Sequence, residues 1–245
     1  MKKRFLILLI VILICILFPL VYYIINITRA TDSININLSS LDSKTFKYEY
    51  ESLNDTLDEN GEYKYIPISI AENNKFKYVS YEKLTSIIEG KTGVIYLGFP
   101  ECPWCRRVLP ILSASCEKYK FDSIYYYNAL DIRDEKHLNS SGEIVEDKAG
   151  DEKYYKLISL LKDYIGEYKG LNDSSIKRIY FPTIIFVKDG VILGVQISAT
   201  DSYTNAKEEM TSSQKNELEQ IFDSYLEKMY EKIPNDECSD TKGGC

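Results

Sequence analysis

Two cysteines three residues apart, Cys102 and Cys105, stand at the junction of an apolar run and an amphipathic run. Residues 93–99 are apolar on both faces, as a central strand requires, and residues 102–120 repeat apolar side chains at helical spacing. A cysteine in the first turn of a helix faces unpaired backbone N–H groups and the positive end of the helix, and both favour the thiolate. The spacing therefore predicts a dithiol centre that can make, break or pass on a disulfide.

Two other interpretations of the pair are a structural disulfide and half of a zinc site. A disulfide across so short a loop removes little entropy from the unfolded chain. Zinc needs four ligands, whereas the chain has one histidine and its other candidate pair, Cys238 and Cys245, lies in a polar tail. We therefore expect no metal and no bound cofactor. Cys116, on the apolar face of the same helix, is expected to be a buried and inert thiol.

The N-terminus carries an unbroken apolar run over residues 5–25, and a bilayer core needs about 20 such residues as a helix. Three basic residues precede the run, and only Arg29 follows it closely. This pattern predicts a single-pass anchor in the cell membrane, with the N-terminus in the cytoplasm and residues 30–245 outside. A cleaved signal peptide is the alternative. Disulfides persist in the outside compartment, and a net charge of −7 argues against a nucleic-acid partner.

Composition divides the chain into four expected regions. They are a cytoplasmic tip and transmembrane anchor (1–29), a polar tether (30–62), a folded domain (63–233) and a cysteine-containing tail (234–245).

Within the folded domain, hydrophobic periodicity predicts an α/β arrangement, with a central sheet, helices on both faces and a hairpin at one edge. The expected strands are 64–70, 75–79, 93–99, 123–132, 180–187 and 191–197. The expected helices are 80–89, 102–120, 154–168 and 211–232, and residues 134–152 are expected to form a charged loop.

Several of these features together resemble the thioredoxin superfamily over about residues 64–232. They are the strand that runs into Cys102-Pro-Trp-Cys105, a proline at position 110, and Phe181-Pro182-Thr183 followed by a strand and the turn Asp189-Gly190. The run Tyr96-Leu-Gly-x-Pro-x-Cys is also similar to a bacterial membrane-anchored branch, the bacteriocin transport accessory proteins. The resemblance implies a bacterial origin and a thioredoxin-like mixed sheet flanked by helices, with a helical insertion before a cis-proline.

The resemblance also implies roles for single residues. Cys102 would be the attacking thiolate and Cys105 the resolving thiol. Pro182 would be cis, and Phe181 with Trp104 would contact an extended substrate.

The chain departs from the family at the proton acceptor for the resolving thiol. Tyr96 stands where the family has a buried aspartate, and residues 125–127 lack the family's lysine. Tyrosine is a poor base because its ordinary pKa is about 10. Glu101, next to Cys102, and water are the candidate substitutes.

Two functions follow from these features. The first is a membrane-anchored extracytoplasmic thiol–disulfide oxidoreductase acting on cysteine-containing secreted or membrane proteins or peptides, with a membrane redox partner and an open direction of electron flow. The alternative is a weakly active or inactive accessory module that binds a secreted peptide during export or maturation. Cys238 and Cys245 could form a second disulfide, either as a local staple or as an electron shuttle.

Overall fold

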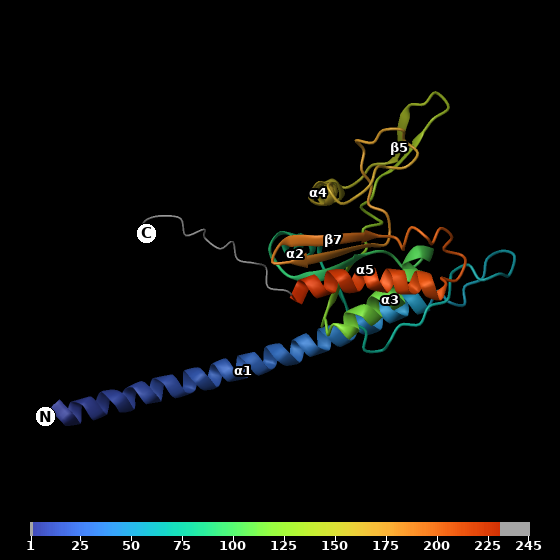
Figure 1. Ribbon diagram of the computed structural model, residues 1–245. Coiled ribbons are helices and arrows are strands. Elements are labelled where there is room, and N and C mark those ends of the chain that lie inside the picture. Colours follow the sequence, from blue (N-terminus) through green and yellow to red (C-terminus); the bar gives the residue numbers. More distant parts are fainter. Residues whose placement is uncertain (1, 231–245) are drawn as a thin grey trace, which may run out of the picture.

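A computed structural model describes residues 2–230 of the chain, which form a mixed α/β fold (Figure 1). The helices are α1 (Lys2–Glu51), α2 (Tyr81–Gly90), α3 (Pro103–Lys118), α4 (Glu152–Leu161) and α5 (Ser212–Tyr230). The strands are β1 (Phe76–Tyr78), β2 (Gly93–Leu97), β3 (Ile124–Tyr127), β4 (Glu135–Leu138), β5 (Ile144–Lys148), β6 (Thr183–Lys188) and β7 (Val191–Ile197).

The main sheet has five strands in the order β1-β3-β2-β6-β7. Strand β3 pairs in parallel with β1 and β2, whereas β6 pairs antiparallel with both β2 and β7, so the sheet is mixed. All five residues of the central strand β2 are buried, which agrees with its uniformly apolar sequence. The β6–β7 hairpin turns at Asp189 and Gly190, where both residues adopt positive φ angles (49° and 79°).

Helices flank the sheet because successive residues of β2 point to opposite faces. On one face, Gly93 lies so close to Ile87 of α2 that a Cβ atom would be 3.3 Å from the Ile87 side chain. On the other face, the ring of Tyr96 stacks on Tyr126, with centroids 5.6 Å apart, and meets the edge of Phe46 from α1. Helices α3 and α5 cover this second face together with the C-terminal turns of α1 (Figure 1).

Helix α1 enters the folded domain, which corrects the prediction of a polar tether over residues 30–62. Phe46 and Tyr50 are fully buried, and the Phe46 ring stacks on Phe76 with centroids 3.9 Å apart. These two residues are four apart, so they lie on one face of the helix and fill the space over β1 and β2. The domain therefore begins before residue 63, within the last turns of α1.

Residues 5–25, predicted to cross a membrane, lie in the N-terminal half of α1. Among the residues whose side chains the structure describes, none of the helices combines the length and the apolar character that a membrane crossing requires. The predicted tail, 234–245, lies outside the described residues.

The strand predicted over 64–70 does not form. Its backbone groups are bound by the side chains of Glu51 at the end of α1, Asn54 just after it and Arg106 from α3, rather than by a neighbouring strand. The Asn54 side chain bonds both the N–H and the carbonyl of Ile68, and the Glu51 carboxylate accepts the N–H of Ile70 at 2.7 Å. This segment is thus held in an extended form outside the sheet.

Residues 134–152, predicted to be a charged loop, contain the two-stranded hairpin β4–β5. Strands β4 and β5 carry charged residues on both faces, so the alternation of apolar and polar residues that marks a half-buried strand is absent. The hairpin is linked to the body by the backbone N–H of Lys136, which donates to the Tyr168 hydroxyl at 2.8 Å, and the Lys136 ammonium is 3.0 Å from the fully buried Asp134. The hairpin extends away from the main sheet (Figure 1), whereas α4, which ends at Leu161 rather than at residue 168, buries Tyr154, Leu157 and Leu161 in the core.

Candidate active site

Cys102 forms the N-cap of α3, directly after the loop that leaves β2. Pro103 fills the first helical position, where no backbone N–H is needed. The Cys102 Sγ atom accepts a hydrogen bond from the backbone N–H of Cys105 at 3.2 Å and is hydrogen bonded to the Cys105 thiol. Both cysteines are free thiols. The start of the helix therefore holds two sulfur atoms side by side, as the spacing predicts.

The surroundings of the two thiols separate their acidities. The hydrogen bond from Cys105 lowers the pKa of Cys102 against the opposing effect of burial, with help from backbone N–H groups and from the charge of Arg133. Burial, together with the adjacent Cys102, raises the pKa of Cys105 well above its ordinary value. Cys102 is thus the thiol that ionises first, and the thiolate is the nucleophile in disulfide exchange.

The peptide bond between Phe181 and Pro182 is cis, as predicted. It brings the carbonyl oxygen of Phe181 to 3.6 Å from the Cys102 sulfur. The Phe181 ring packs edge-on against Phe99, and the Arg133 guanidinium lies over it, 5.1 Å from the centroid. The segment before β6 is thereby fixed against the thiol that ionises first.

Trp104 completes the set of predicted site residues. Its half-buried ring meets Tyr203 edge-on, with centroids 5.4 Å apart. Trp104 and Phe181 also line a hollow of about 610 Å³, with Tyr180 and Thr200 among its other residues. Of the five predicted residues, Trp104 and Phe181 line this hollow, the Phe181 carbonyl before Pro182 contacts Cys102, and Cys105 lies fully buried beside Cys102.

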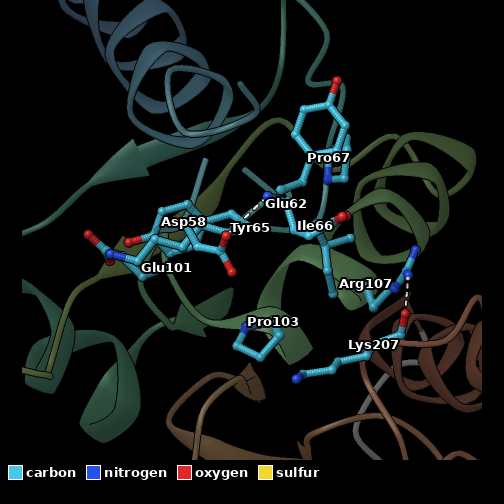
Figure 2. Close-up of a pocket in the computed structure, with 11 residues that line it drawn as sticks. Asp58, Glu62, Tyr65, Ile66, Pro67, Glu101, Pro103, Arg107 and Lys207 are labelled. Atoms are coloured by element: carbon cyan, nitrogen blue, oxygen red, sulfur yellow. Dashed lines mark hydrogen bonds between the residues drawn. The ribbon is translucent and has the colours of Figure 1, made fainter. Parts of the chain in front are cut away.

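A second hollow, of about 580 Å³, has Glu101 and Pro103, the two chain neighbours of Cys102, in its wall (Figure 2). Figure 2 shows the acidic Asp58 and Glu101 on one side of it and the basic Arg107 and Lys207 on the other. Two hollows thus lie near the dithiol centre, one with four aromatic residues and the charged Glu167, Lys169 and Asp201 in its wall, the other of mixed charge.

A buried tyrosine pair beneath Cys105 was missed at the level of sequence. The hydroxyls of Tyr96 and Tyr50 are 2.8 Å apart, and both side chains are fully buried. The Tyr96 hydroxyl and the Cys105 sulfur meet over Gly98, where an added methyl group would collide with the hydroxyl and come within 3.0 Å of the sulfur. The hydrogen bond between Tyr96 and Cys105 lowers the pKa of Cys105, although burial outweighs it. The one signal in the sequence was the four-residue spacing of Phe46 and Tyr50.

Arg106, next to Cys105 in the chain, helps to hold the segments around the cysteine pair in place and is only 2% exposed. Its guanidinium donates to the carbonyl oxygens of Tyr50, at 2.8 Å, and Pro100, at 3.0 Å, and also to Ile66 and the Asn54 side chain. One buried cation therefore ties the end of α1 to the loop that precedes Cys102.

The remaining candidates contribute no further chemistry to the site. Burial raises the pKa of Cys116 to about 12, in agreement with an inert thiol. Within residues 2–230, no three histidine, cysteine or acidic side chains are grouped so that they could hold a metal ion. Cys238 and Cys245 lie outside the described residues, so their pairing stays a prediction.

Known proteins give no further guide to the function of this site. No protein-family model and no curated protein matches the chain.

Proposed function

We propose that this chain is a thiol–disulfide oxidoreductase with a thioredoxin-like fold, in which Cys102 attacks and Cys105 resolves. One observation carries the proposal: the thiol with the lowered pKa lies at a helix start, 3.6 Å from the carbonyl that precedes a cis-proline, with a second thiol beside it. A structural cysteine pair has no need of a lowered pKa or of a neighbouring hollow.

The exchange follows in two steps. The Cys102 thiolate attacks one sulfur of a substrate disulfide, the substrate S–S bond breaks, and the other substrate sulfur leaves as a thiolate. Cys105 then attacks the Cys102 sulfur, forms the Cys102–Cys105 disulfide and releases the second substrate sulfur. The substrate gains two electrons and the enzyme loses two. In the opposite direction, a substrate thiolate attacks Cys102 of the oxidised pair, and Cys105 leaves as a thiolate. A second substrate thiolate then attacks the substrate sulfur of the mixed disulfide, forms the substrate disulfide and releases Cys102.

The hollow beside Trp104 and Phe181 suits the substrate. It is lined mainly by aromatic, small and hydroxyl side chains and opens next to Cys102. We propose cysteine-containing secreted or membrane proteins or peptides as its substrates, since these need disulfide exchange outside the cytoplasm. This location, with a membrane anchor at residues 5–25, remains a proposal from the apolar run and the basic residues before it.

A second function, an accessory module that binds a secreted peptide without redox turnover, is favoured by one observation. The residue beneath Cys105 is an uncharged tyrosine rather than a carboxylate, so the ordinary base for the resolving step is missing. The same hollows would then serve binding alone.

Trapping of covalent partners separates the two functions. A Cys105→Ser chain, expressed in its host, should accumulate mixed disulfides at Cys102 that a reductant releases, because the resolving thiol is gone. The Cys102→Ser chain is the matched control and should trap none. A double Cys102→Ser, Cys105→Ser chain that keeps full activity in the host would reject the oxidoreductase and support the binding module.

A further inference from the structure

The resolving step needs a group that stabilises the Cys105 thiolate. The buried carboxylate of the thioredoxin superfamily is absent here, because Tyr96 stands at its position. We propose that the hydroxyl of Tyr96, oriented by Tyr50, donates a hydrogen bond to the Cys105 thiolate and so stabilises the form that resolves the mixed disulfide. This inference rests on the proposed function, because it concerns the second step of the exchange.

The geometry places three hydroxyl-bearing rings around Cys105 from three different elements. Tyr96 comes from β2, Tyr50 from α1 and Tyr126 from β3, and each is at most 2% exposed. The Tyr50 and Tyr96 hydroxyls are 2.8 Å apart, and the Tyr96 and Tyr126 rings are stacked. Gly98 leaves the space through which the Tyr96 hydroxyl reaches the Cys105 sulfur. A glycine is needed here because any side chain would displace that hydroxyl.

The direction of donation follows from what each group can do. A thiolate only accepts hydrogen bonds, whereas a phenol can donate one. Burial raises the pKa of Tyr96 and of Tyr50 well above the ordinary value, so both stay protonated and neither acts as a base. Tyr96 therefore donates to Cys105, and Tyr50 donates to the Tyr96 oxygen. Hydrogen bonds in such a chain polarise and strengthen one another in a low-dielectric interior.

The proton balance of the resolving step needs no base other than water. Cys105 loses its proton to water and becomes the thiolate that Tyr96 stabilises; this thiolate bonds to the Cys102 sulfur, the bond between Cys102 and the substrate sulfur breaks, and the substrate leaves as a thiolate. The tyrosine hydroxyls keep their protons throughout. The ionisable groups that face Cys105 are Cys102 on α3, Tyr96 on β2, Tyr50 on α1 and Tyr126 on β3. Glu101 and Glu49 act on Tyr126 from farther away.

The two steps can be timed separately with 5,5′-dithiobis(2-nitrobenzoate). Attack by Cys102 releases one thionitrobenzoate, and attack by Cys105 on the resulting mixed disulfide releases a second. We would use the full chain with Ser at positions 15, 238 and 245, follow absorbance by stopped flow, and repeat the measurement across pH.

Tyr96→Phe should leave the first phase unchanged, slow the second by about ten-fold and move its midpoint to higher pH, because one hydrogen bond to a charged group is lost. Tyr50→Phe should act in the same direction but less, since the donor to Cys105 remains. The matched control is Tyr119→Phe, which removes a hydroxyl bonded to Glu227 at the surface and should change neither phase.

The outcomes separate the two proposals. Second phases that are identical in Tyr96→Phe and Tyr119→Phe would overturn the tyrosine donor while leaving the oxidoreductase intact. A parent chain without a first phase would instead overturn the proposed function. If circular dichroism shows that Tyr96→Phe is unfolded, Tyr50→Phe decides, and an unchanged midpoint in that variant rejects the inference.

Discussion

At the scale of residues, the difference between the two thiols comes from their positions on one helix turn. Cys102 lies before the first turn and receives backbone and side-chain donors, whereas Cys105 lies one turn deeper and is fully buried. The largest cause of the lowered pKa of Cys102 is its hydrogen bond with Cys105. The acidity of the outer thiol therefore depends on the presence of the inner one.

Removing that donor should make Cys102 less reactive at low pH. In Cys105→Ala, the pKa of Cys102 rises because the thiolate loses its main hydrogen bond, so the pH midpoint for alkylation by iodoacetamide should move up. Cys105→Ser is the matched control, because its hydroxyl still donates and should move the midpoint less. An unchanged midpoint in Cys105→Ala would show that the backbone N–H groups alone set the acidity.

Site residues could be predicted where the signal is local. Cys102 and Cys105 are three residues apart, and the cis bond at Pro182 was inferred from the short run around it. Tyr50 could not be found in this way, because it contacts Tyr96 across 46 positions of the chain. A contact of that range is set by how α1 packs on the sheet, and the four-residue spacing of Phe46 and Tyr50 does not say which strand they pack against.

At the scale of elements, the C-terminal turns of α1 are part of the folded domain. We expect Phe46→Ala to lower the free energy of unfolding by about 3–5 kcal/mol, because it empties a fully buried site. Tyr48→Ala, on the same helix but 73% exposed, should change it by about 0.5 kcal/mol or less. Denaturation in urea measures both. Equal, small effects would mean that α1 is only loosely associated.

Elements were predicted well where apolar periodicity decides the structure. Strand β2, helix α3 and the β6–β7 hairpin follow the expected ranges closely. The segment 64–70 has strand-like composition, yet the side chains of Asn54, Glu51 and Arg106 bind its backbone. The β4–β5 hairpin was missed because charged residues lie on both faces of its strands, so no apolar alternation marks them as strands. In both segments the structure depends on which groups hydrogen bond to the backbone, and the sequence pattern does not identify those groups.

At the scale of the whole molecule, the orientation relative to a membrane can be tested directly. With Ser141→Cys as the only cysteine, at the exposed turn of the β4–β5 hairpin, a membrane-impermeant maleimide should label intact cells. Lys3→Cys in the same background is the matched control and should be labelled only after lysis, because positive residues keep the N-terminus inside. Labelling of Ser141→Cys only after lysis would place the dithiol centre in the cytoplasm.

The continuity of α1 also determines the reach of the dithiol centre. A helix rises about 1.5 Å per residue, so Tyr50 stands about 38 Å along the axis from the end of the apolar run at residue 25. A flexible linker of the same length would let that separation fluctuate widely and allow the centre to sweep a volume. A continuous helix instead holds Cys102 at a nearly constant distance from any membrane in which residues 5–25 are embedded. With the proposed anchor in a membrane, the proposed oxidoreductase would reach only partners whose cysteines lie at that distance from the membrane, and lengthening α1 by whole turns would change which of them it reaches.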